Sequence, residues 1–164
     1  MGNAIAKEDP RWVAIRAARA EDLPAIVALL AQDEIGEQHE TVTDPLPASY
    51  HAAFAKIDRD PAHLLVVAES HRRVVGTLQV TFLQYLTHGG GMRAQIEAVR
   101  VAQDVRGSGL GRVLVGWAVD EARQRGAHVV QLTTDARRDR AQRFYESLGF
   151  RPTHVGMKLY LEDA

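Results

Sequence analysis

The segment from Ile96 to Arg112 restricts the fold of this 164-residue chain more than any other part of it. A mostly apolar, strand-like run over residues 96–101 leads into the glycine-rich turn Arg106-Gly107-Ser108-Gly109-Leu110-Gly111. From the end of this turn to about Arg125, apolar residues recur at helical spacing. A strand, a glycine turn and an amphipathic helix in this order are typical of an α/β sheet protein.

The remaining patterns predict further strands and helices on both sides of this segment. Strand patterns cover residues 12–18, 64–68, 74–86, 93–101, 129–133 and 155–161, and helical stripes begin near Leu23, Ala53, Gly109 and Ala141. The order β-α-α-β-β-β-α-β-α-β predicts a mixed central sheet with helices on its faces, in a single domain over residues 12–164. Residues 1–11 are polar, include Pro10 and are expected to form a mobile tail.

Composition excludes several classes of function. The chain has 20 basic and 21 acidic residues, which argues against a nucleic-acid binder that depends on bulk positive charge. It has no cysteine, hence no disulfide, thiolate metal site or cysteine nucleophile, and its seven histidines show no metal-binding spacing. No apolar run reaches the ~20 residues of a membrane span. Since no secretory signal is evident either, we expect a cytoplasmic protein without a metal.

The glycine turn has the chemistry of an anion site. The first four backbone N–H groups of a helix have no partner within the helix, and the helix dipole adds positive potential there. Glycines let the backbone approach a ligand closely, and Arg106 and Arg112 can add charge-assisted hydrogen bonds. A phosphate or diphosphate is therefore the expected ligand. The spacing fits neither the phosphate loop of nucleotide triphosphatases nor the dinucleotide-binding fingerprint.

Two motifs resemble those of the GCN5-related N-acetyltransferase (GNAT) family. Arg106, Gly109 and Gly111 match the family's cofactor motif Gln/Arg-x-x-Gly-x-Gly/Ala. The segment Ala141-Gln142-Arg143-Phe144-Tyr145-Glu146-Ser147-Leu148-Gly149-Phe150 matches the family's Ala-x-x-Phe-Tyr-x-x-x-Gly-Phe ending. The resemblance covers roughly residues 12–162 and implies the GNAT-type mixed sheet of six to seven strands flanked by about four helices.

The resemblance implies acetyl-CoA as co-substrate, bound in a V-shaped opening between the fourth and fifth strands. The diphosphate would meet the backbone of the glycine turn, and the pantetheine arm would pair with the end of the fourth strand like an added strand. The residues expected to contact acetyl-CoA are Val99, Arg100, Val101, Arg106, Gly107, Ser108, Gly109, Leu110, Gly111, Arg112 and Arg138. Arg138 stands where the family often has an asparagine that touches pantetheine. The basic run 137–140 around it fits either a solvated helix start or a patch near the 3′-phosphate.

The same resemblance implies direct transfer to an amine with Tyr145 as general acid. A phenol can protonate the leaving thiolate, whereas the alternative for Tyr145 is a packing role on the helix stripe. Glu97 interrupts an apolar strand and is the candidate general base, acting through water from a partly desolvated position. The alternative is a buried structural glutamate paired with Arg93 or Arg100. The thioester oxygen would meet a backbone N–H near Val99.

The acceptor is expected to be a primary amine of a small molecule or peptide. The acidic loop 33–48 would suit a cationic amine, although a loop that is merely solvated explains the same charges. The competing functions are a non-catalytic acyl-CoA-binding sensor or partner module on the same fold, and a protein that binds ATP or NAD at the turn. The family resemblance further suggests a homodimer.

Overall fold

The computed structural model describes residues 12–32 and 40–161 of the chain. These residues fall into two compact units, the first ending at Leu132 and the second beginning at Thr133. The tail predicted over residues 1–11 and the acidic residues Asp33, Glu34 and Glu37 lie outside the described residues.

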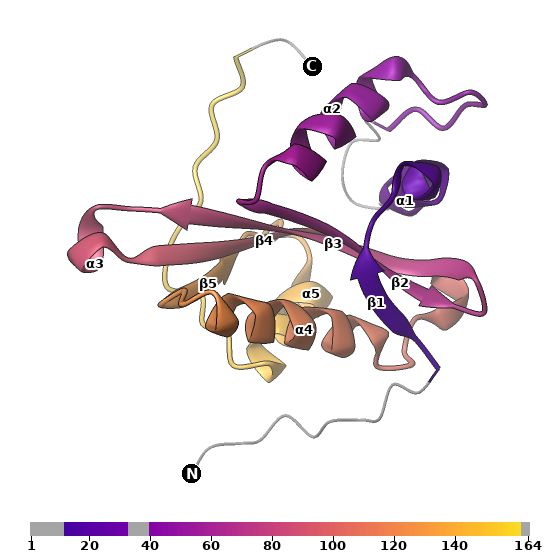
Figure 1. Ribbon diagram of the computed structural model, residues 1–164. Helices are drawn as coiled ribbons and strands as arrows, with labels where there is room; N and C mark the ends of the chain where they lie inside the picture. The colour runs from indigo at the N-terminus through magenta and orange to yellow at the C-terminus, as the bar shows by residue number, and fades with distance from the viewer. Residues whose placement is uncertain (1–11, 33–39, 162–164) are drawn as a thin grey trace. The chain divides into compact units, whose positions relative to one another are not determined.

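The first unit is built on a sheet to which five strands contribute among the described residues (Figure 1). Its elements are β1 (Ala14–Ala17), η1 (Ala20–Asp22), α1 (Leu23–Leu30), α2 (Ala48–Arg59), β2 (His63–Ser70), β3 (Arg73–Gln84), α3 (Thr87–Gly90), β4 (Met92–Val101), η2 (Gln103–Val105), α4 (Leu110–Gln124) and β5 (Val129–Leu132). The strands lie in the order β1-β2-β3-β4-β5. Consecutive strands are antiparallel except β4 and β5, which are parallel and are connected through α4.

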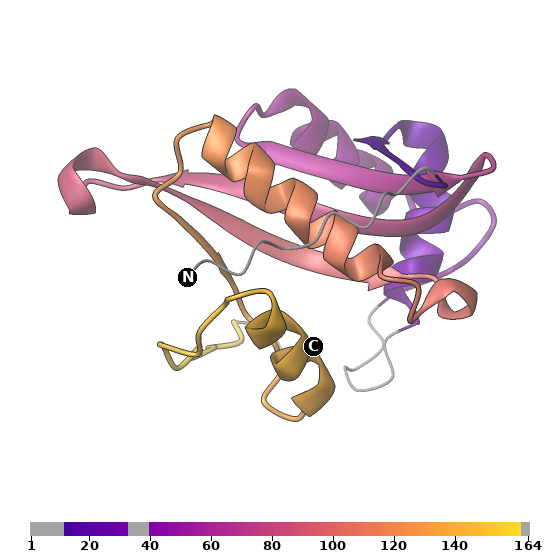
Figure 2. The ribbon, with the colours of Figure 1, turned by 90° about the horizontal axis from the view of Figure 1, so that it is seen from below.

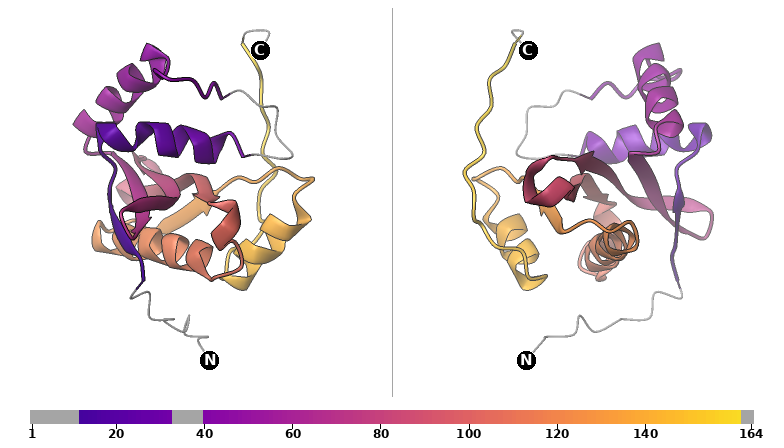
Figure 3. Two further views of the ribbon diagram at one scale, coloured as in Figure 1. Left: turned by 90° about the vertical axis from the view of Figure 1, so that its right-hand side faces the viewer. Right: turned by 60° about the vertical axis from the view of Figure 1, so that its left-hand side comes forward.

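Helices cover both faces of this sheet, as predicted. Figure 2 shows α4 lying across one face, and the left view of Figure 3 shows α1 and α2 on the opposite face. On the α4 side, a β-carbon added at Gly76 of β3 would lie 3.0 Å from the Leu114 side chain, so this glycine allows the helix to approach the strand closely. On the other side, the α1 residue Ile26 packs with Val67 of β2, and Phe54 of α2 packs against them.

The predicted helices correspond to α1, α2, α4 and α5, and the described residues add the short elements η1, α3 and η2. The connection between β3 and β4 contains the four-residue element α3, in which His88 and Gly89 have positive φ angles of 56° and 67°. Such angles do not continue a right-handed helix, so α3 works as a tight connection between β3 and β4.

The second unit contains α5 (Asp139–Ser147) followed by an extended segment. The helix presents the predicted stripe, of which Phe144 and Tyr145 are half-buried. Gly149, with a φ of 92°, follows the end of the helix, and the Phe150 N–H returns to the Tyr145 carbonyl at 3.1 Å.

The strand predicted over residues 155–161 is wrong in the structure. Residues 155–160 have no regular secondary structure, and the alternating apolar side chains remain exposed, with Met157 at 92% and Leu161 at 89%. A period of two shows that a segment can form a strand, but a strand exists only where a neighbour accepts and donates the backbone hydrogen bonds. The described sheet therefore has five strands, and the six to seven expected from the family resemblance are not reached.

Candidate functional site

The glycine turn connects η2 to α4 and has the backbone conformation that its sequence requires. Gly107 and Gly109 both have φ angles of 86°, and Gly109 is the N-cap of α4. A β-carbon added at Gly107 would meet no heavy atom within 4 Å. Gly107 is therefore needed for its backbone angle, since space for a side chain is available, and the turn faces an open surface.

Four backbone N–H groups of this turn are left unused by the fold. Within the part of the chain that the structure describes, the N–H groups of Gly107, Gly109, Leu110 and Gly111 donate no backbone hydrogen bond. Those of Arg112 and Val113 both donate to the Gly109 carbonyl, at 2.9 and 3.2 Å, and so belong to the helix. The four unused donors lie at the positive end of the 15-residue helix α4, where an anion is favoured.

Two arginines flank these donors. Arg106 is exposed, and its Nε lies 3.3 Å from the carbonyl oxygen of Val101, so the guanidinium is held between the turn and the end of β4. Arg112 is half-buried in the first turn of α4. Both add positive charge beside the four N–H groups, which together suit a doubly charged diphosphate.

β4 and β5 separate next to this turn. Their parallel pairing ends at Ile96 and Leu132, whereas β4 stays paired with β3 as far as Val101. The register between β3 and β4 shifts where Ala98 has a φ of 54°, so a β-bulge bends β4 at this point. The residues of β4 beyond the bulge therefore have a strand on one edge only.

The free edge of β4 exposes backbone groups of Val99 and Val101. The Ala102 N–H donates to the Val75 carbonyl of β3 at 2.9 Å. Because successive residues of a strand direct their backbone groups to opposite edges, Val101 and Val99 direct theirs away from β3. Side chains accordingly reach these carbonyls: Arg100 donates to Val99 at 3.0 Å, and Arg106 donates to Val101. The edge can accept an extended ligand as an added strand.

Glu97 lies at the point where the two strands separate. The partly desolvated position expected for it is wrong, because Glu97 is exposed. The same exposure excludes the alternative of a buried structural glutamate. The pairing of β4 with β5 ends at Ile96, one residue before Glu97, so β5 no longer flanks β4 where Glu97 is exposed.

Tyr145 and Arg138 belong to the second unit. The Tyr145 ring makes edge-on contacts with Phe144 and Phe150, with ring centroids 5.1 and 5.8 Å away. Arg138 is the N-cap residue of α5, and its backbone N–H donates to the Asp135 carbonyl at 3.0 Å. Asp135 also accepts hydrogen bonds from Arg137, which lower the pKa of this carboxyl far below its usual range.

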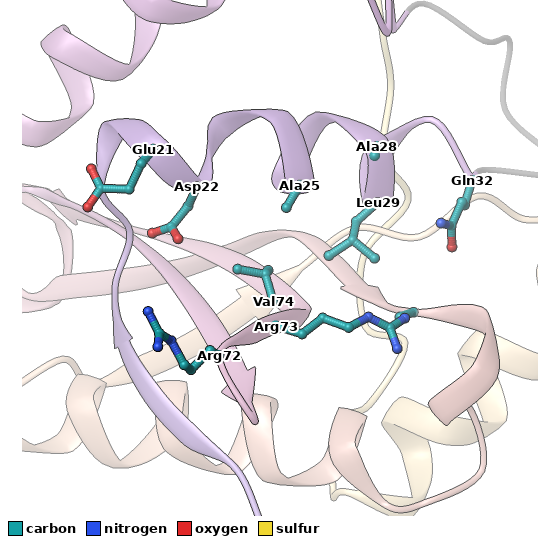
Figure 4. Close-up of a pocket in the computed structure, with 10 residues that line it drawn as sticks. Glu21, Asp22, Ala25, Ala28, Leu29, Gln32, Arg72, Arg73 and Val74 are labelled. Carbon is teal, nitrogen blue, oxygen red and sulfur yellow. The ribbon is translucent and has the colours of Figure 1, made fainter.

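A pocket of about 470 Å³ lies on the α1 side of the sheet (Figure 4). Its lining comes from η1, α1 and Gln32, from Arg72 and the start of β3, and from Ala102. Two of its charged residues are paired: Arg73 donates two hydrogen bonds to Asp104, at 2.7 and 2.8 Å. Asp22 accepts two from Arg16, at 2.7 and 2.9 Å, and these lower the pKa of Asp22. No predicted site residue lines this pocket.

Two absences hold for the described ranges 12–32 and 40–161. No three His, Cys, Asp or Glu side chains gather there as a metal ion would require. No helix within those ranges is both long and apolar enough to cross a membrane.

A row of polar side chains, which the sequence did not predict, crosses the sheet. His63, Thr81, Gln95 and Gln131 lie opposite one another on β2, β3, β4 and β5. Polar residues at alternate positions of an apolar strand are visible in the sequence, but the register that aligns four strands is not.

Comparisons with known proteins place this geometry in a family. The model of the acetyltransferase (GNAT) family matches residues 23–150. The chain is 29% identical over 143 residues to an aminoalkylphosphonate N-acetyltransferase of Salmonella typhimurium, covering 85% of this chain and 86% of that protein. It is 34% identical over 89 residues to a glucosamine 6-phosphate N-acetyltransferase of Trypanosoma brucei brucei, covering 54% and 58% of the two chains.

A solved structure is closer in sequence. A crystal structure described as a transcriptional regulator from Bacillus halodurans C-125 has 47% sequence identity and a TM-score of 0.88, and the alignment covers 91% of this chain and 99% of that one. The family match covers residues of both compact units. It confirms the fold class and the acyltransferase class that the two motifs predicted. The chain belongs to the acetyltransferase (GNAT) family.

Proposed function

We propose that this protein transfers an acetyl group from acetyl-CoA directly to a primary amine of a small molecule or peptide. One observation carries the proposal: four unused backbone N–H groups at the start of α4 lie beside the free edge of β4. Together they offer an anion site and an extended hydrogen-bonding edge, which are the two features that a diphosphate joined to a pantetheine arm requires.

The residues of the first unit divide the binding of acetyl-CoA among them. The backbone of Gly107, Ser108, Gly109, Leu110 and Gly111 holds the diphosphate. Arg106 and Arg112 balance its charge. Val99 and Val101 hydrogen-bond the pantetheine arm through their backbone groups, next to Arg100. We assign Arg138 of the second unit to the cofactor as well, because it stands where the family often has an asparagine that touches pantetheine.

Three groups of the chain would act on the reacting atoms. Glu97 removes a proton from the bound ammonium through a water molecule, for which its exposed position leaves room, so that the neutral amine can attack the thioester carbon. A second proton leaves the nitrogen for solvent as the amide forms. The Val99 N–H stabilises the negative charge that develops on the thioester oxygen. As the carbon–sulfur bond breaks, the Tyr145 phenol donates its proton to the sulfur, and the phenolate then regains a proton from solvent.

The second candidate function is a non-catalytic sensor of acyl-CoA. The description of the Bacillus halodurans structure as a transcriptional regulator favours this reading. The same turn and strand edge would bind the ligand, but no acetyl group would be transferred. Glu97 and Tyr145 would then have no chemical role.

A transfer assay separates the two functions. The purified protein is incubated with acetyl-CoA and single amines from several classes, namely amino sugars, polyamines, peptides and aminoalkylphosphonates, and free thiol is measured. Amine-dependent thiol release supports the enzyme. A melting temperature raised by CoA but not by ATP or NAD, without amine-dependent release, supports the sensor instead. The cytoplasmic location and the homodimer expected from the sequence stay predictions.

A further inference from the structure

The sheet face under α1 and α2 changes character along its strands. Where the helices cover it, the face is apolar: Val67 of β2 packs with Ile26 and Ala18, and Leu65 packs against this cluster. His63, the first residue of β2, lies two residues before Leu65 and therefore on the same face. His63 begins the polar row, which consists of His63, Thr81, Gln95 and Gln131.

The side chains of the polar row contact each other across the strands. The Gln131 Nε2 donates to the Gln95 Oε1 at 2.8 Å, and the His63 Nδ1 lies 3.1 Å from the Thr81 Oγ1. These contacts orient the side chains and use only part of their hydrogen-bonding capacity. Within the described residues, the Gln95 amide nitrogen and the Gln131 carbonyl oxygen have no hydrogen-bond partner. All four side chains are half-buried, and each is thus accessible in part.

The row is adjacent to the proposed reaction centre. The last residue pair that joins β4 and β5 is Ile96 with Leu132, and the pair before it is Gln95 with Gln131. Glu97 follows Gln95 by two residues and therefore lies on the same face, roughly 7 Å along the strand. A group a few bonds away from an amine bound at Glu97 would lie over the two glutamines.

The side chains of the row that lie next to this centre, those of Gln95 and Gln131, carry no charge. Amide and hydroxyl groups both donate and accept hydrogen bonds, as the hydroxyl groups of a polyol do. Arg93 lies two residues before Gln95 on β4, on the same face, with its guanidinium 4.8 Å from the Tyr85 ring centroid. An apolar amine would instead leave the glutamine groups without partners when water is displaced, which is unfavourable.

We propose that the polar row binds the acceptor and selects a primary amine that carries hydroxyl groups, of the amino-sugar kind. Gln95 and Gln131 are then specificity-determining residues for the acetyl acceptor. The inference rests on the proposed function, because only an acetyltransferase has an acceptor amine. The binding that it predicts can nevertheless be measured without turnover.

The test compares glucosamine with cyclohexylamine, which has the same ring size and no hydroxyl groups. Binding of each amine to the full chain with CoA present is followed by NMR of the glutamine side-chain amides. The variants are Gln95→Met and Gln131→Met, and Gln124→Met on the exposed end of α4 is the matched control. We expect each row variant to raise the Kd for glucosamine about tenfold, while the Kd for cyclohexylamine and the melting temperature change little.

Three outcomes would overturn the inference. Glucosamine could bind no more tightly than cyclohexylamine, the row variants could leave its Kd unchanged, or they could weaken both amines equally, as a structural role would. Glucosamine binding that depends on the row, with no transfer to any amine, would refute the proposed function and leave the row's role intact. Acetyl transfer to amines, with glucosamine binding that does not depend on the row, would support the proposed function and refute the role of the row.

Discussion

Gly107 and Gly126 have nearly the same left-handed backbone angle on the two sides of α4, with φ values of 86° and 77°. At both positions an added β-carbon would meet open space. Replacement by alanine therefore imposes a similar backbone strain at each, about 1 kcal/mol. Only Gly107 belongs to the turn that carries the unused N–H groups, so the two glycines form a matched pair.

We expect Gly107→Ala to lower CoA affinity at least tenfold, because the turn must distort to accommodate a β-carbon at this angle and its N–H groups then lose their common direction. Gly126→Ala should lose similar stability and bind CoA like the unchanged protein. Isothermal titration with CoA and urea unfolding of both variants provide the two measurements. Equal CoA affinity in the two variants would contradict the placement of the diphosphate.

Tyr145→Phe should reduce kcat roughly 100-fold while the Kd for CoA stays within about twofold. The substitution keeps the ring contacts with Phe144 and Phe150 and removes only the hydroxyl group that would protonate the sulfur. Tyr160→Phe, at an exposed tyrosine of the same unit, is the control. Steady-state kinetics and CoA titration test this, and a loss of CoA binding with kcat preserved would indicate a packing role.

Glu97→Gln should lower kcat/KM for the amine about 100-fold or more, because an amide cannot take up the proton that the carboxylate removes. The melting temperature should not fall, since the side chain is exposed. Glu146→Gln, an exposed position on α5, should leave both quantities unchanged. If the variant at position 97 kept full activity, the general base would have to be another group.

Asp22→Asn should destabilise the fold by about 2 kcal/mol at neutral pH. Asp22 is buried and accepts hydrogen bonds from the Arg16 guanidinium and the Arg19 backbone N–H, which join β1 to the start of α1. Asparagine lacks the negative charge opposite Arg16. Asp104→Asn, which removes an exposed partner of Arg73, should have a smaller effect.

The destabilisation by Asp22→Asn should depend on pH. The hydrogen bonds from Arg16 lower the pKa of Asp22 in the folded state below the ordinary 3.8. Its stabilising effect is therefore complete above the ordinary carboxyl pKa and is lost as the pH falls through the lower folded value. Urea unfolding between pH 7 and pH 2 should show the two proteins converging in stability at the acid end. A difference that stays constant with pH would contradict this origin.

Features that depend on a few neighbouring residues were predictable from the sequence. The helix from Leu110 onward, the glycine N-cap and the Gly149 stop follow from local backbone preferences and from a periodic apolar stripe. The family, too, was recognisable because its two motifs are local patterns of this kind. The four longer helices and the five strands up to β5 were therefore predicted, with small differences at their ends.

Features that depend on pairing between distant strands were decided only by the tertiary structure. No local pattern marks the bulge at Ala98, where β4 keeps its pairing with β3 after its pairing with β5 has ended, and Glu97 is exposed at this point. The polar row exists because the registers of four strands align residues as distant in sequence as His63 and Gln131. Residues 155–161 show the same limit from the other side: their alternation permits a strand, but hydrogen bonds to a neighbour decide whether one forms.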